Sequence, residues 1–137
     1  MEDRRTFMAL AAAAALMPME LFAQAQGGRP NSEVARHLLT GPYDGHEAVL
    51  VEITVPAGSR ATGMGHRHTG PVLGYVLAGE LRFAINNEPE KILPVGSTFF
   101  EPAGAVHTTN GSARTDGPTR AVVFMLVPKG SPLTAPA

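Results

Sequence analysis

The chain has 137 residues, 44% of them hydrophobic and 17% charged, which is the length and composition of one globular domain. Its formal net charge is −1 and it carries no basic stripe, so nucleic acid is not an expected partner. The chain has no cysteine, which excludes disulfides and thiolate metal sites.

The first 25 residues have the layout of an export signal. Two arginines at positions 4 and 5 precede a weakly hydrophobic run at 8–17, and small residues favour cleavage after Ala25. The arginine pair resembles a twin-arginine signal, although its flanking residues depart from that pattern and leave Sec export open. The run is shorter than the roughly 20 residues that span a bilayer. We therefore expect a periplasmic or secreted protein without a stable membrane anchor.

The remaining chain is predicted to consist of short strands. Residues 26–32 are polar and rich in Gly and Pro, so a flexible leader is expected there, followed by a barrel over 33–129 and a disordered tail over 130–137. Apolar residues alternate over 47–55, which indicates a half-buried strand. Further strands are expected, in chain order, through 66–68, over 72–77, 80–86, 91–93 and 97–101, through 107, and over 119–127.

Many short strands separated by Gly, Pro and Asn turns favour an all-β sandwich or barrel. Alternation along the strands selects the side chains expected to fill its interior. These are Val51, Ile53, Leu81, Phe83, Ile85 and Phe99.

Two histidines stand one residue apart, at His66 and His68. Residues two apart in a strand point to the same side, so both imidazoles face one place and form half of a metal site. The same spacing also occurs on strand faces that are merely solvated. A third histidine, His107, follows a Pro-x-Gly turn and favours the metal site.

The surroundings of His107 resemble the second motif of the cupin superfamily, G-x5-PxG-x2-H-x3-N. The match begins at Gly96 and includes Pro102 and Gly104, but the final Asn position holds Gly111, one residue after Asn110. The resemblance implies a cupin-type double-stranded β-helix, that is, a jelly-roll barrel. Cupins also form dimers through sheet contacts, so a homodimer is expected.

The first cupin motif, G-x5-HxH-x3,4-E-x6-G, is matched by His66, His68 and Gly79, with Gly63 closer to the histidines than usual. The acidic position of the motif holds Val72, which cannot bind a metal. In cupins such a loss implies either a three-histidine metal site with open positions or a site that has lost its metal. The intact histidine triad favours the first, since three buried imidazoles without a cation would each need another partner.

Two residues are candidates for an extra ligand. Glu101 lies six residues before His107 on the strand face of Phe99, and it is either a ligand or a surface or turn-capping carboxylate. Met64 shares the facing of the histidine pair and is either a soft ligand or a residue that lines the barrel. The other histidines, His37 and His46, have no second ligand nearby and are expected at the surface.

The residues and the resemblance together predict an exported metal-binding cupin. A divalent transition metal (iron, copper, nickel, manganese or zinc) is expected on the three histidines, with a small organic molecule as substrate and dioxygenase-like chemistry. The alternative is a non-catalytic cupin that binds a small ligand or a metal, because fold alone does not determine function.

Overall fold

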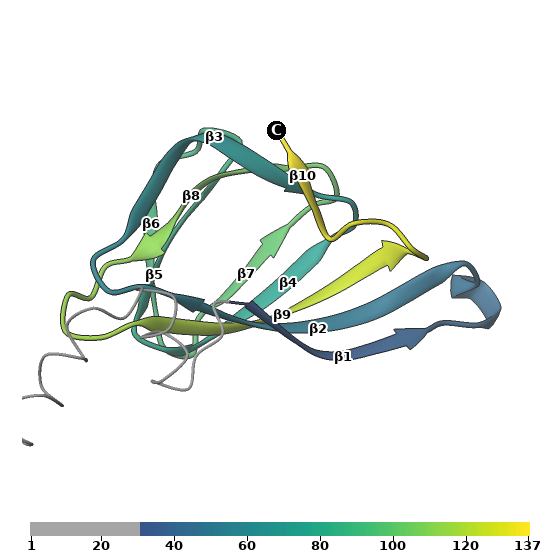
Figure 1. Ribbon diagram of the computed structural model, residues 1–137. Helices are drawn as coiled ribbons and strands as arrows, with labels where there is room; N and C mark the ends of the chain where they lie inside the picture. Colours follow the sequence, from purple (N-terminus) through teal and green to yellow (C-terminus); the bar gives the residue numbers. More distant parts are fainter. Residues whose placement is uncertain (1–30) are drawn as a thin grey trace, which may run out of the picture. The chain divides into compact units, whose positions relative to one another are not determined.

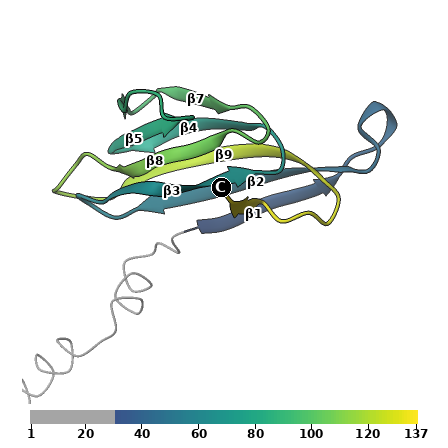
Figure 2. The ribbon, with the colours of Figure 1, turned by 90° about the horizontal axis from the view of Figure 1, so that it is seen from above.

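The computed structural model describes residues 31–137, except for the side chains of residues 62–64. The predicted export signal and the leader up to residue 30 lie outside the described residues. Two antiparallel sheets of five strands each make up the described chain, and Figure 1 shows them facing each other. Seen from above, the strands of both sheets run along one common direction (Figure 2). This is the all-β double-stranded β-helix that the sequence predicted.

The first sheet has the order β1-β2-β9-β4-β7 and the second has the order β10-β3-β8-β5-β6. In the first sheet the strands are β1 (Asn31–Leu38), β2 (His46–Val55), β9 (Thr119–Pro128), β4 (Val72–Ala78) and β7 (Thr98–Glu101). In the second they are β10 (Thr134–Pro136), β3 (Arg60–His68), β8 (Val106–Ser112), β5 (Glu80–Ile85) and β6 (Lys91–Pro94). One turn of 3-10 helix, η1 (Gly41–Tyr43), precedes β2.

The core lies between the two sheets. It is built from the inward-facing residues, which alternate with outward-facing ones along each strand. All six predicted interior residues belong to it or pack against it, Ile53 being the one that is only partly buried. The ring of Phe99 lies against Gly74, where a Cβ would collide with it, so β4 needs a glycine at this point. Phe99 in turn packs on Phe83, with ring centroids 5.0 Å apart. Phe83 also packs against His107, so this aromatic pair lies next to the histidines.

The end of the chain differs from the predicted disordered tail. Strand β10 pairs with β3, placing Thr134 opposite His68 and Pro136 opposite His66. A proline-rich segment can join a sheet as an edge strand because an edge residue does not need its backbone N–H. Leu133 also packs against the core. At the other end, β1 begins at Asn31, inside the predicted leader, and pairs along β2.

Candidate metal centre

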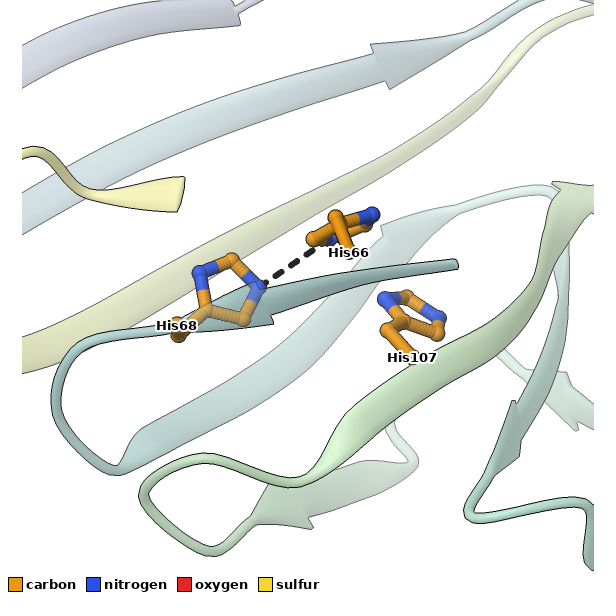
Figure 3. Close-up of side chains that lie close together, drawn as sticks. All are labelled: His66, His68 and His107. Carbon is orange, nitrogen blue, oxygen red and sulfur yellow. Dashed lines mark hydrogen bonds between the residues drawn. The ribbon is translucent and has the colours of Figure 1, made fainter. Parts of the chain in front are cut away.

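Two neighbouring strands bring the three histidines together. His66 and His68 lie on β3, and His107 lies on β8 directly opposite His66. A β-bulge between Thr62 and His66 shifts the register of the two strands just before the pair. Figure 3 shows the three rings converging on one place. The structure therefore gathers the three residues that the sequence selected.

The spacing of the ring nitrogens is close to that of ligands around one ion. His66 Nε2 and His68 Nε2 are 3.2 Å apart. Donors at about 2.1 Å from a common ion would be about 3.0 to 3.4 Å apart for right and tetrahedral angles. One donor atom from each of the three residues lies within 4.8 Å of the others, so small side-chain shifts would bring His107 into the same shell.

The surroundings keep the three imidazoles neutral. Burial, together with the neighbouring His66 and His68, lowers the pKa of His107 to about 4. Burial also lowers the pKa of His66, with a smaller contribution from His68. Burial lowers the pKa of His68, although its hydrogen bond to Leu133 opposes this. Neutral imidazole is the form that binds a metal, so the site is ready for one at neutral pH.

A backbone carbonyl orients His68. Its Nδ1 lies 2.9 Å from the carbonyl oxygen of Leu133, which can only accept a hydrogen bond. The proton of the ring therefore sits on Nδ1, and Nε2 turns its lone pair towards His66 Nε2. Histidines that bind metals commonly donate their second N–H in this way. This role of Leu133 has no sequence signature, because every residue carries a carbonyl.

His107 Nε2 is buried and lacks a hydrogen-bond partner among the described residues. An uncompensated buried polar atom is costly in a folded protein, so it calls for a ligand. Three imidazoles that each place a ring nitrogen within 4.8 Å of the others are a donor set that suits a divalent transition metal.

Glu101 lies beside the same histidines. It is 2% exposed, so the interpretation as a surface carboxylate is wrong. Its Oε2 lies 3.7 Å from His68 Nε2, and its Oε1 lies 3.6 Å from His107 Nδ1. Burial raises the pKa of Glu101 to about 7. Met64, the other candidate for an extra ligand, is among the residues whose side chains lie outside the described part.

The remaining histidines do not take part. His37 is exposed on β1, as predicted, while His46 is partly buried at the start of β2. His46 Nδ1 lies 3.3 Å from the carbonyl oxygen of Asp44. Within residues 31–137 there is no helix of the length and hydrophobicity that a membrane crossing requires.

Solved structures share this fold. An uncharacterized conserved protein with a double-stranded beta-helix domain from Klebsiella pneumoniae is 19% identical, with a TM-score of 0.59 over 78% of this chain and 82% of that one. The DMSP lyase DddQ from Ruegeria pomeroyi is 25% identical, with a TM-score of 0.50 over 75% of this chain and 50% of the lyase. Salicylate 1,2-dioxygenase from Pseudoaminobacter salicylatoxidans is 15% identical, with a TM-score of 0.53 over 78% of this chain and 29% of the dioxygenase.

A search of curated protein sequences found no match. The family model described as "Cupin domain" matches residues 51–125, a stretch that contains all three histidines and Glu101. More than half of the chain is covered by this match. The protein belongs to the cupin family.

Proposed function

We propose that the protein is an exported cupin in which His66, His68 and His107 hold a divalent transition metal and act on a small organic molecule. The observation that carries this proposal is the convergence of three neutral imidazoles, with His107 Nε2 buried and without a partner. Structural likeness to the DMSP lyase DddQ, a protein named for a reaction of a small molecule, supports a substrate of that size.

The protein positions the three histidines and determines how far each is exposed to solvent. His66 and His68 are only partly buried, so the histidines are reached from solvent on the β3 side. Phe83 packs against His107, with ring centroids 5.2 Å apart, and both side chains are buried. A metal bound here would supply Lewis-acid or redox chemistry. Iron, copper, nickel, manganese and zinc all accept imidazole ligands, and we propose oxygenation as the reaction class.

The test is substrate consumption by protein loaded in turn with each of these metals. Small carbonyl and phenolic compounds are offered with and without dioxygen. We expect oxygen-dependent consumption by the wild-type protein and none by the variant with His66, His68 and His107 changed to alanine. Consumption without dioxygen would contradict oxygenation and favour a lyase. Tight metal binding without any turnover would contradict the enzyme and favour a binding cupin.

Export through the twin-arginine route, with cleavage after Ala25, belongs to the same proposal. The sequence features of residues 1–25 support it. That route carries folded proteins, so the metal would be inserted in the cytoplasm before export. In a strain that lacks the twin-arginine translocase, the protein should stay in the cytoplasm. Folded protein in the periplasm of that strain would show that export uses Sec.

We also propose that two copies associate through the outer face of the first sheet. Leu73 on β4 lies between Phe100 on β7 and Phe124 on β9, and these three side chains are 53%, 55% and 42% exposed. Tyr75 and Leu77 extend the exposed row along β4. An apolar row of this kind complements a second copy of itself, as a twofold dimer requires.

A charge in this row should separate the copies. We expect Phe100→Glu to convert a dimer into a monomer, because a dimer would bury the new carboxylate without a partner. Ile92→Glu is the matched control, since Ile92 is 45% exposed on β6 of the other sheet. Sedimentation equilibrium measures the mass of each. A wild-type monomer at micromolar concentration, or a Phe100→Glu dimer, would contradict this interface.

A further inference from the structure

The carboxylate beside the histidines has no partner that explains its burial. Glu101 Oε2 is buried and accepts no hydrogen bond from the described residues. Among the described residues, no arginine or lysine forms an ion pair with Glu101. Its carboxylate instead lies 3.7 Å from His68 and 3.6 Å from His107. Burying a carboxylate is costly unless a cation or hydrogen bonds compensate for it. A cation held among these side chains would remove that cost.

The strand register explains why Glu101 stands in this place. Glu101 on β7 lies directly opposite Val72 on β4. Paired residues of antiparallel strands point to the same face with their Cβ atoms about 5 Å apart. Val72 is 1% exposed and faces the interior, and so does Glu101. A carboxylate at either position therefore reaches the same volume beside the histidines.

We propose that Glu101 is the fourth protein ligand of the metal. From β7, Glu101 supplies the carboxylate that an acidic residue at position 72 of β4 would otherwise supply. This proposal rests on the proposed function. The distance of 3.7 Å from Glu101 Oε2 to His68 Nε2 is a few tenths of an ångström wider than the spacing of two donors around one ion. The site then offers three nitrogens and one oxygen, and the carboxylate lowers the net charge of a bound divalent ion by one.

The test exchanges the carboxylate between the two strands. Binding of Co²⁺ and Mn²⁺ is measured by competition with a chelator, together with the visible absorption of the Co²⁺ form, for the wild-type protein, Glu101→Gln, and the double variant Val72→Glu/Glu101→Val. Glutamine keeps the shape of the side chain and removes its charge. Glu90→Gln is the control, because Glu90 pairs with Arg60 and Arg82, away from the histidines.

We expect Glu101→Gln to bind both ions at least about a hundredfold more weakly and to change the Co²⁺ spectrum, since loss of a supporting group alone costs 10- to 100-fold. The double variant should recover most of the affinity, and Glu90→Gln should match the wild type. Unchanged affinity and spectrum in Glu101→Gln, with metal lost in the triple histidine variant, would overturn the role of Glu101 and leave the proposed function standing.

Two further outcomes also decide the question. Loss of metal in Glu101→Gln without recovery in a folded double variant would overturn the exchange between strands, although Glu101 would remain a ligand. A wild-type protein that binds neither these ions nor iron, copper, nickel or zinc would overturn the proposed function itself, and the role of Glu101 with it.

Discussion

Glutamine in place of Glu101 is expected to raise the free energy of unfolding of the metal-free protein, relative to the wild type, as pH rises. The difference between the two proteins should be about 3 kcal/mol larger near pH 8 than below pH 4.5. The carboxyl has a pKa of about 7 in the folded protein, raised by burial from an ordinary value of 4.5. At a pH between 4.5 and about 7, the carboxyl of Glu101 is protonated in the folded chain and ionised in the unfolded chain. The wild-type protein therefore loses stability as pH rises from 4.5 to 7, and the glutamine variant does not.

Titration of the histidines does not affect this comparison, because the wild-type protein and Glu101→Gln both contain them. The lowered pKa of His107 gives a slope of the opposite sign, with stability lost as pH falls from 6.5 towards 4. That slope cancels when the two proteins are subtracted at each pH. Urea unfolding in the presence of a chelator, from pH 4 to 8, measures the difference. A difference that stays constant with pH would show that Glu101 titrates as an ordinary exposed carboxyl.

The same substitution is expected to weaken metal binding, so Glu101 acts in opposite directions on the two properties. In the metal-free protein it is an uncompensated buried charge above pH 7. With a cation present it becomes a partner. A residue that lowers stability in the absence of its ligand is typical of a functional site and not of a packing role.

The second large effect is expected from the end of the chain. Removal of residues 131–137 takes away strand β10 and the carbonyl of Leu133 that accepts the Nδ1 proton of His68. Without that acceptor the ring of His68 is no longer held in the orientation and tautomer that direct Nε2 to the metal. We expect metal affinity to fall 10- to 100-fold in a chain that still folds.

Leu133→Ala separates this effect from loss of packing. The variant keeps the carbonyl and removes the side chain that packs against the core. It should lose some stability while keeping wild-type metal affinity. Circular dichroism establishes folding of each variant before chelator competition measures affinity. Equal affinity in the truncated and full-length chains would show that the tail does not position His68.

The fold and the histidines could be predicted because their signals are local. Alternation placed Val51, Leu81 and Phe83 in the core, where they lie. The HxH spacing and the turn before His107 selected the three residues that the strands bring together. Each signal is contained in a short stretch of sequence, either as the two-residue period of a strand or as a turn motif.

The remaining parts of the site depend on contacts distant in sequence. The shared strand face of Phe99 and Glu101 indicated an inward carboxylate, but carboxylates are almost never fully buried unless they are paired. Only the pairing of Glu101 with Val72 shows what it could replace. The contact between His68 and Leu133 spans 65 residues and uses a backbone atom, so no pattern of side chains could indicate it.

Metal content tests the central claim most directly. Elemental analysis is made on protein purified from its native compartment, beside the variant with His66, His68 and His107 changed to alanine. We predict close to one equivalent of iron, copper, nickel, manganese or zinc in the wild-type protein and loss of that metal in the variant. A wild-type protein without metal, as well folded as the variant, would contradict the metal centre and leave a cupin whose histidines serve another purpose.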